Sequence, residues 1–346
     1  MSPRRGPAPR CRSRRPPAGL SKRATALVLG SLLLLGPTPD AAAQPAPRAD
    51  VSRLDYRLQA RHLGQGVHVV EGDNDDFSVA NGCNIINTGF IVADEGVLVI
   101  NTGPSRRYGE QLRALIARTT PRPVLQVVHL NLHPDYFLGN QAFADVPRLA
   151  TAATREGIAR ESASYETNLY RLCGDWMKGT ETLPPDRVLD VSAGRGKLAI
   201  GSRVVEWHLF RGHTASDLVL VDRSSGVAFA GGLVFHQRVP TTPHAELPAW
   251  MNSLQAFEQI GASQVVPSHG PVHSGTAGAA ATLRFLRWLD ESFARHAERG
   301  LEMNEVLRAP VPAEFTGWAA FRTEFVRNVA HLYPRYEAQA LGTPRR

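Results

Sequence analysis

The chain has 346 residues, of which 43% are hydrophobic and 21% charged, a composition that suits a globular protein with a sizeable core. Its formal net charge of +7 is carried by the first 43 residues, which hold eight Lys and Arg and one Asp. Residues 44–346 are therefore neutral, and a neutral body argues against nucleic-acid binding.

The N-terminal segment has the layout of a secretory signal peptide. A basic run from Arg4 to Arg23 precedes an apolar run from Ala24 to Leu35, and Ala41 to Ala43 precede the predicted cleavage point. An apolar run of about 12 residues is too short for a transmembrane helix, which needs roughly 20. We therefore predict a signal peptide at 1–43, a linker at 44–50, no stable membrane span and a periplasmic or secreted location. An uncleaved anchor is the alternative.

Two cysteines, Cys83 and Cys173, remain after this leader, an even number in an exported chain. The sequence leaves open whether they form a disulfide. Their wide separation is not that of a close metal-ligand pair, which argues against a cysteine-based zinc site.

Hydrophobic periodicity divides the first half of the chain into short strands and two helices. The expected strands are 67–71, 85–92, 97–101 and 124–128, and the expected helices are 107–118 and 154–172. The second and third strands form a predicted hairpin, which turns at 93–96.

The second half repeats this order of strands followed by helices. The expected strands are 197–200, 204–210, 218–221, 227–230 and 263–266, and the expected helices are 248–260, 278–299 and 317–338. Two β-rich halves, each followed by helices, predict two packed sheets with helices outside, a four-layer α/β sandwich. We assign 51–275 to this domain and 276–346 to a C-terminal helical extension.

Three histidines each follow a predicted strand and lie beside a turn signal. They are His133, with Asp135 two residues later, then His213 and His269. A lone loop histidine usually has an ordinary role. Three of them with an aspartate, all near strand ends, indicate one shared site on loops. Imidazole and carboxylate groups suit Zn²⁺, with Fe and Mn as less suitable occupants.

These motifs resemble, in order and spacing, those of the metallo-β-lactamase superfamily over about residues 65 to 275. They most resemble the quinoprotein relay system zinc metallohydrolases, exported proteins associated with quinoprotein dehydrogenases. The motifs that carry the resemblance are Asn87–Phe90, Asn101–Gly103, His129–Asn140, Gly212–Thr214, Gly231–Phe235 and Pro267–Gly270. The resemblance implies an αβ/βα sandwich, a two-metal hydrolytic site and a quinoprotein dehydrogenase system as partner.

This chain differs from the family pattern at several ligand positions. The family loop reads His-x-His-x-Asp-His, and its first and last histidines fall on Asn131 and Tyr136. The bridging aspartate falls on Gly232, and a supporting aspartate falls on Asn101. The retained candidate ligands are His133, Asp135, His213 and His269. Each of the two sites keeps two ligands, whereas a catalytic zinc normally has three, so we expect zero or one ion.

Two functions follow from this inventory, and the sequence leaves open whether the protein is an enzyme. The first is an exported metal-dependent hydrolase with at most one ion, in which metal-bound water attacks a carbonyl group of a small molecule. In that reading the four retained residues are ligands, and Asp135 and His133 are the candidate catalytic groups. The second is a catalytically silent periplasmic binding protein on the same fold.

Neighbouring residues have two readings each. His129 lies on the same strand face as His133, where it either replaces a lost ligand or, as we favour, bonds to the protein deeper in the sandwich. Tyr136, Phe137, Trp250 and Arg238 are candidates for the cleft walls. For the three aromatic residues we favour core packing.

Overall fold

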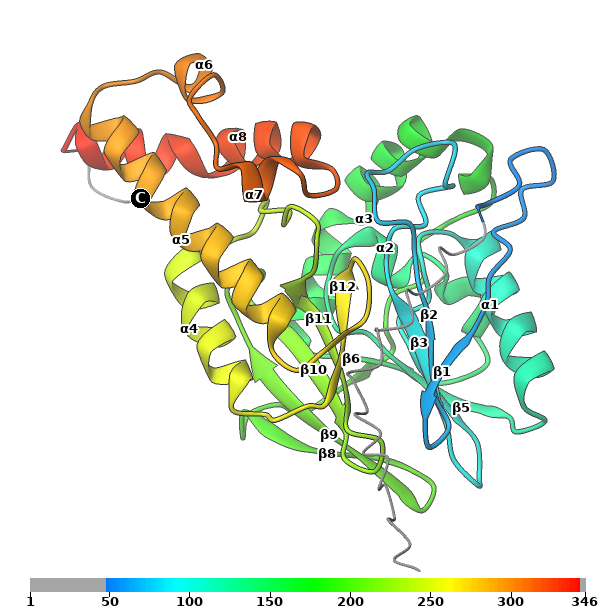
Figure 1. The fold of residues 1–346 in the computed structure, drawn as a ribbon. Helices are drawn as coiled ribbons and strands as arrows, with labels where there is room; N and C mark the ends of the chain where they lie inside the picture. Colours follow the sequence, from blue (N-terminus) through cyan, green and yellow to red (C-terminus); the bar gives the residue numbers. More distant parts are fainter. Residues whose placement is uncertain (1–47, 343–346) are drawn as a thin grey trace, which may run out of the picture. The chain divides into compact units, whose positions relative to one another are not determined.

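Two β-sheets lie face to face in the computed structural model of the protein, which describes residues 48–342 (Figure 1). The predicted signal peptide and most of the predicted linker lie outside the described residues. None of the helices between residues 48 and 342 has the length and apolarity needed to cross a bilayer.

The first sheet is antiparallel from its first to its fourth strand and parallel from there on. In spatial order its strands are β1 (Arg61–Gly64), β2 (Val67–Val70), β3 (Thr88–Val92), β4 (Val97–Ile100), β5 (Val124–Val128), β6 (Arg148–Ala150) and β7 (Arg187–Val188).

The second sheet contains one parallel pair, β11 with β12, and is otherwise antiparallel. In spatial order its strands are β13 (His273–Ser274), β12 (Gln264–His269), β11 (Val227–Phe235), β10 (Asp217–Asp222), β9 (Arg203–Phe210) and β8 (Arg195–Ile200).

Helices follow the strands of each half. Those of the first half are α1 (Arg106–Thr119), α2 (Pro134–Phe137) and α3 (Ala152–Cys173), with the 3-10 helices η1 (Asn140–Phe143) and η2 (Gly174–Met177). Those of the second half are α4 (Leu247–Glu258), α5 (Ala277–Glu298), α6 (Met303–Val306), α7 (Ala313–Thr316) and α8 (Phe321–Ala340).

Strand periodicity produces the four layers. In β4, Leu98 and Ile100 face the second sheet, while Val99 faces outward and packs with α1. In β10, Leu220 joins the core between the sheets and Val221 packs outward with α4 and α5. Figure 1 shows α1 outside one sheet and α4 with α5 outside the other. The predicted four-layer sandwich is confirmed.

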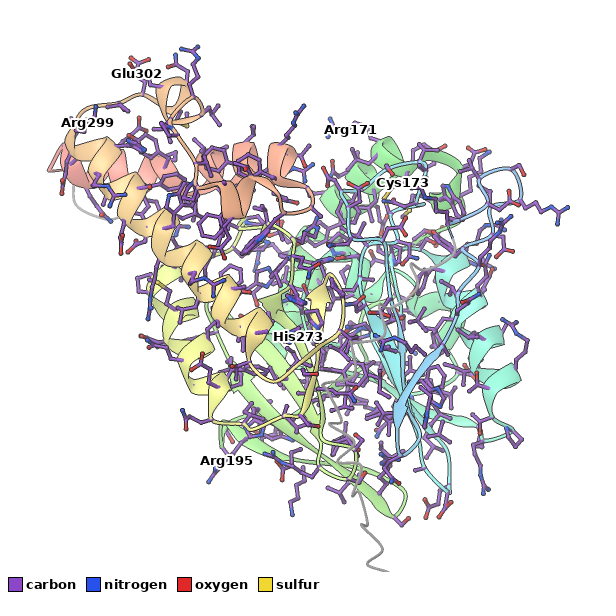
Figure 2. All side chains as sticks on the ribbon, viewed as in Figure 1. Arg171, Cys173, Arg195, His273, Arg299 and Glu302 are labelled. Carbon is purple, nitrogen blue, oxygen red and sulfur yellow. A yellow bond between two sulfur atoms is a disulfide. The ribbon has the colours of Figure 1, made fainter. Side chains whose placement is uncertain are left out.

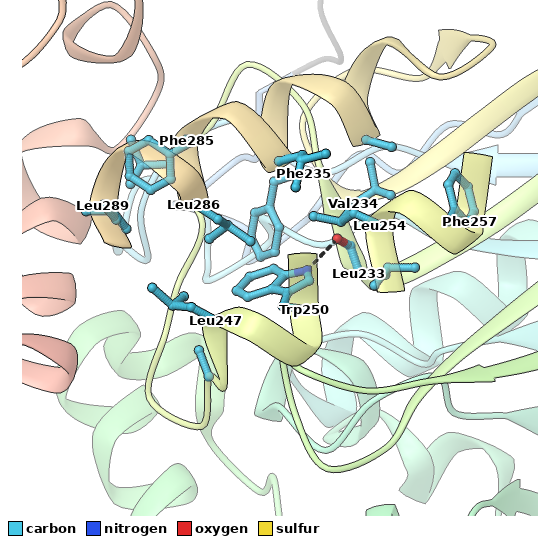
Figure 3. Packing of buried hydrophobic residues seen from close by; sticks show 14 of the residues in the cluster. Leu233, Val234, Phe235, Leu247, Trp250, Leu254, Phe257, Phe285, Leu286 and Leu289 are labelled. Carbon is cyan, nitrogen blue, oxygen red and sulfur yellow. Dashed lines mark hydrogen bonds between the residues drawn. The ribbon is translucent and has the colours of Figure 1, made fainter. Parts of the chain in front are cut away.

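The outer core of the second half is rich in aromatic residues. Trp250 of α4 and Phe235 of β11 are both buried, with ring centroids 6.0 Å apart (Figure 3). The indole Nε1 of Trp250 donates a hydrogen bond of 2.9 Å to the carbonyl oxygen of Leu233, which ties α4 to the sheet. Burying a large ring and satisfying its polar atom are both needed for such a position to be stable.

Most predicted elements are confirmed, and four boundaries are wrong by three residues or more. Strand β3 begins at Thr88 instead of Ile85, and β12 ends at His269 instead of Val266. Strand β11 continues to Phe235 instead of ending at Ala230, because Gly231 adopts the left-handed conformation (φ 52°) and the chain resumes pairing with β12. Helix α8 begins at Phe321 instead of Gly317, because Ala320 is left-handed (φ 55°) and interrupts helical geometry. Several short elements have no clear signal in the sequence, namely β1, β6, β7, β13, α2, α6 and α7.

Cys83 and Cys173 form a disulfide, with their Cα atoms 5.9 Å apart. This resolves the choice that the sequence left open. The bond joins the loop before β3 to the last residue of α3, where Figure 2 labels Cys173. Both cysteines are fully buried.

The C-terminal helices pack onto the sandwich and belong to the same compact unit. Helix α5 contacts β11, and α8 packs against α5 through Phe293 and Tyr333. The hydroxyl of Tyr333 donates a hydrogen bond of 2.6 Å to the carbonyl oxygen of Leu301. At its other end, α8 reaches the loop after β11, where Glu324 of its first turn lies 3.3 Å from Arg238.

Candidate functional site

The loop after β5 carries the first candidate residues and is held by the end of the neighbouring strand. Asn101 follows β4 in a left-handed conformation (φ 59°), and its side-chain oxygen accepts a hydrogen bond of 3.1 Å from the backbone N–H of Leu130. Pro134 then starts α2, whose first turn contains Asp135. Proline is well suited to the first turn of a helix because no hydrogen bond from its nitrogen is needed there. His133 and Asp135 are thus fixed at the edge of the sheet.

Three of the four predicted site residues line one cavity of about 350 Å³. They are His133, Asp135 and His269, the last residue of β12. Nε2 of His269 lies 3.6 Å from Oδ2 of Asp135, and its Nδ1 lies 2.8 Å from the carbonyl oxygen of Ile85. Because a carbonyl only accepts, Nδ1 carries the proton and Nε2 is left as an acceptor.

Burial sets the protonation of these groups. It lowers the pKa of His269 well below its usual range, with the charge of Arg238 acting in the same direction. Burial likewise lowers the pKa of His133, with His213 as the next cause. For Asp135 burial has the opposite effect and raises the carboxyl pKa to about 7. The cavity therefore contains neutral imidazoles and a carboxyl group that is part-protonated near neutral pH.

The fourth predicted residue, His213, lies beside the cavity and does not line it. Its ring centroid is 4.7 Å from that of His133 and 4.8 Å from that of Trp250. The preceding Gly212 is left-handed (φ 122°) and approaches the backbone of Trp250 too closely for any side chain. Asp217 fixes the turn by accepting hydrogen bonds of 3.1 and 3.0 Å from the backbone N–H groups of His213 and Thr214.

Asn131 connects the two loops. Its Nδ2 donates a hydrogen bond of 2.8 Å to Oδ1 of Asp217 and lies 3.3 Å from Nδ1 of His213. Its side-chain oxygen accepts a hydrogen bond of 3.1 Å from the backbone N–H of His133. The amide thus bonds at both ends within a fully buried position. Asn131 acts here as a structural connector between His133 and the Asp217 turn.

Gly232 lies directly under the ring of His213. A Cβ atom at this position would lie 2.0 Å from Nδ1 of His213 and 2.9 Å from Nδ2 of Asn131. Real Cβ atoms do not approach other atoms so closely, so this arrangement has no room for an aspartate side chain. The imidazole of His213 occupies the space into which such a side chain would extend.

Tyr136 and His129 belong to the interior. Tyr136 is fully buried among the residues between the two sheets, and burial raises the pKa of its phenol well above the usual range. The phenol is therefore protonated, which argues against a tyrosinate ligand. Nδ1 of His129 lies 3.2 Å from the backbone carbonyl oxygen of Tyr136, so this histidine bonds to the protein. Phe137 and Trp250 are also in the hydrophobic clusters.

The described residues do not present a metal-binding arrangement. Within 48–342, no group of three or more His, Cys, Asp or Glu side chains is placed to hold an ion. A catalytic zinc normally needs three protein ligands. Four buried atoms on or beside the cavity wall nevertheless have no hydrogen-bond partner among the described residues: Nε2 of His133, Nε2 of His213, Oδ2 of Asp135 and Oε2 of Glu324. The present geometry fits neither the two-ion centre nor a three-ligand centre.

The remaining cavity wall contains charged residues, of which the sequence indicated only Arg238. Arg238 is 1% exposed, and its Nη2 lies 3.3 Å from Oε1 of Glu324 in the first turn of α8. The same carboxylate oxygen is 2.9 Å from Nη1 of Arg327, and His331 follows one turn later on the cavity wall. Arg238 was a wall candidate from the sequence. Glu324, Arg327 and His331 lie in the predicted extension, about 90 residues further on, and gave no local signal.

The fold and the site together define a class, the two-sheet αβ/βα sandwiches with polar loops at the ends of the strands. The sequence model of the "Metallo-beta-lactamase superfamily" matches residues 81–269, more than half of the chain. The chain belongs to the metallo-β-lactamase superfamily, whose members usually bind zinc.

Solved structures agree with this assignment. A metallo-β-lactamase from Pontibacter korlensis is 25% identical, with a TM-score of 0.53 over 66% of this chain and 99% of that one. A metallo-β-lactamase from Hirschia baltica has the same fold at 18% identity, with a TM-score of 0.53 over 66% of this chain and 97% of that one.

A curated relative is longer than this chain. A linear primary-alkylsulfatase from Pseudomonas sp. (strain ATCC 19151) is 20% identical over 298 residues, which cover 73% of this chain. The chain spans 56% of that protein's length.

Proposed function

We propose that the protein is an exported, catalytically silent metallo-β-lactamase-fold protein that binds a small organic molecule in the cavity beside His133, Asp135 and His269, without a bound metal ion. The observation that carries the proposal is the contact between Gly232 and His213. The ring of His213 fills the space that a bridging aspartate would need. The amide of Asn131 also contacts that ring and donates a hydrogen bond to Asp217, which holds both in place.

The cavity supports small-molecule binding. Its volume of about 350 Å³ falls at the lower end of the usual range for ligand pockets, about 300–1,000 Å³. Its lining combines apolar side chains such as Ile85 and Leu169 with polar ones that include His133 and Arg238. The name of the distant relative, a linear primary-alkylsulfatase, also points to an organic substrate.

Export is supported by two independent features. The first is the signal-peptide pattern of residues 1–43. The second is the disulfide between Cys83 and Cys173, because such bonds persist mainly in oxidising compartments. A periplasmic or secreted location is therefore part of the proposal, and so is proximity to a quinoprotein dehydrogenase system, which rests on the sequence resemblance alone.

A second candidate is a hydrolase that uses a single ion. The unpartnered atoms of His133, His213 and Asp135 favour it, because buried polar atoms normally have partners and a ligand-free metal site leaves its donors unsatisfied. Zinc suits imidazole and carboxylate donors, with iron or manganese as weaker candidates. In that case His133, Asp135, His213 and His269 would hold the ion, and the ion would activate water.

Metal analysis of the purified mature protein separates the two. Zinc, iron and manganese are measured per chain after exposure to each ion, with His133→Ala and His269→Ala as comparison variants. The binding function predicts less than about 0.1 ion per chain, unchanged in both variants. An ion bound at full occupancy and lost in both variants would refute it and favour the second candidate.

A further inference from the structure

The cavity combines an apolar wall with a charged floor. Ile85, Leu169, Leu172, Phe77 and Pro134 supply apolar surface, and Ile85 and Leu169 are almost fully buried. Apolar lining of this kind favours a ligand with a hydrocarbon part, because about 0.8 kcal/mol is gained per buried methylene.

The floor contains a buried guanidinium group with unused donors. A guanidinium has five N–H groups. Nε of Arg238 donates to the carbonyl oxygen of Asp75 at 3.0 Å, Nη1 to that of Val239 at 3.4 Å, and Nη2 to Glu324 at 3.3 Å. Within the described part of the chain, each terminal nitrogen therefore keeps one N–H group without an acceptor. Since Arg238 lines the cavity, an incoming oxygen atom can accept from it.

Arg238 also lies beside the positions that the resemblance assigns to one of the family's ions. Burial lowers the pKa of His269, and the charge of Arg238 is the next cause of that shift. Burial raises the pKa values of Asp135 and Tyr136, and Arg238 opposes that rise as a smaller influence. Asp135, Tyr136 and His269 occupy the three positions that the resemblance gives to the second ion. A fixed organic cation thus lies close to a place where the family has a metal cation.

The arginines that line the cavity differ in how far they are already paired with carboxylates. Arg171, Arg238 and Arg327 line it, against the carboxylates of Asp135 and Glu324. Glu324 is shared between Arg238 and Arg327, and Arg327 also pairs with Asp76 at 2.9 Å. Arg171 is exposed at the end of α3 (Figure 2), and its Nη2 donates a hydrogen bond of 2.9 Å to the uncharged side chain of Asn168. A cation at the rim attracts anionic ligands toward the opening.

We propose that the cavity takes an amphipathic organic anion. Its carboxylate or sulfate group accepts hydrogen bonds from Arg238, and its apolar part lies along Ile85, Leu169 and Leu172. This ligand class rests on the proposed binding function and specifies what that site recognises. The neutral His133, whose Nε2 has no partner among the described residues, completes the polar end of the cavity.

Calorimetric titration tests the ligand class. The probes are decyl sulfate, decanoate, octyl glucoside and decyltrimethylammonium, each below its micelle-forming concentration, and inorganic sulfate alone. We expect one-to-one binding of the two anionic amphiphiles, and binding at least about 10-fold weaker for the uncharged and cationic ones, since hydrogen bonds to a charged group change affinity by about 10- to 100-fold. Inorganic sulfate lacks the apolar part and binds weakest.

Variants locate the site. Arg238→Met with Glu324→Gln removes both charges together and avoids leaving one buried charge unpaired. We expect it to weaken decyl sulfate binding by about 10-fold or more. Leu172→Asp, at a half-buried wall position, should do the same. Arg148→Met is the matched control, because Arg148 is also buried and paired with a carboxylate but lies outside the cavity.

Three results would overturn the inference. They are equal binding of anionic and cationic amphiphiles, no binding of any amphiphile by the folded protein, and unchanged binding in a folded Arg238→Met, Glu324→Gln variant. Melting temperatures show which variants are folded. If the protein binds neither amphiphiles nor metal, only the proposed ligand class is refuted. Full metal occupancy would refute the proposed binding function itself.

Discussion

The imidazole of His213 and the backbone of Gly232 are in direct contact, and a Cβ atom on Gly232 would lie 2.0 Å from Nδ1 of that ring. Gly232→Asp should therefore fail to recreate a metal bridge and should destabilise the fold by about 1–3 kcal/mol, the usual range for overpacking. Urea denaturation measures the change. Gly317→Ala is the control, because a Cβ atom there meets nothing closer than 3.8 Å. A Gly232→Asp protein that is as stable as wild type and binds two zinc ions would contradict this reading.

Asn131 should be needed as an uncharged amide. Asn131→Ala removes its bonds to Asp217 and to the backbone of His133, and should lower the free energy of unfolding by about 1–3 kcal/mol. Asn131→Asp has nearly the same shape but places a second carboxylate against Asp217, and should destabilise more than alanine at pH 7. Chemical denaturation of both variants tests the order, and an Asn131→Asp protein of wild-type stability would refute it.

The disulfide should contribute substantially to stability, because its cysteines are 90 residues apart in the sequence. The chain-entropy relation gives about 4–5 kcal/mol for a loop of this length. Cys83→Ala with Cys173→Ala should therefore melt well below wild type. Reducing agent should lower the melting temperature of wild type and leave the double variant unaffected. Equal sensitivity of both proteins to reduction would show that the bond has no stabilising role.

Acid should destabilise the protein through its buried neutral histidines, of which His273 is a testable case. Burial, followed by the nearby His236, lowers the His273 pKa from 6.5 to about 4. Between those values the unfolded chain binds the proton and the folded chain does not, so stability falls as pH decreases from 6.5 toward 4. The contribution is up to about 3 kcal/mol.

His273→Gln should flatten this part of the pH–stability profile, measured by urea denaturation between pH 4 and 7. His62→Gln is the control, because His62 is exposed. A His273→Gln profile that still parallels wild type throughout this range would contradict the assignment.

Local patterns were enough to predict the layers and the loop after β5. Short apolar runs bounded by turn residues indicated β4 and β10, and the turn after β5 placed His133 and Asp135 just beyond a strand end. His269 was found for the same reason, since it ends a strand next to a glycine. Such signals depend on a few neighbouring residues, which a single sequence displays.

What the sequence could not show were contacts between distant residues. From the sequence, Gly232 is simply a position that lacks a metal ligand. In the structure, the absence of a side chain at Gly232 leaves the space that the ring of His213 occupies. The partnership of Arg238 with Glu324 joins residues 86 positions apart and depends on how α8 packs. Neither relationship has a spacing or period that a pattern could reveal.

Part of the cavity wall comes from α8, through Glu324, Arg327 and His331, while the family match ends at residue 269. A relative that has only the matched region can form the part of the cavity around β11 and β12, but it lacks the wall that α8 supplies. Ligand preference among such chains can therefore change when the C-terminal helices change, even though the family region stays the same. If substrates were assigned from the matched region alone, proteins would be grouped by common ancestry even where their cavities bind different ligands.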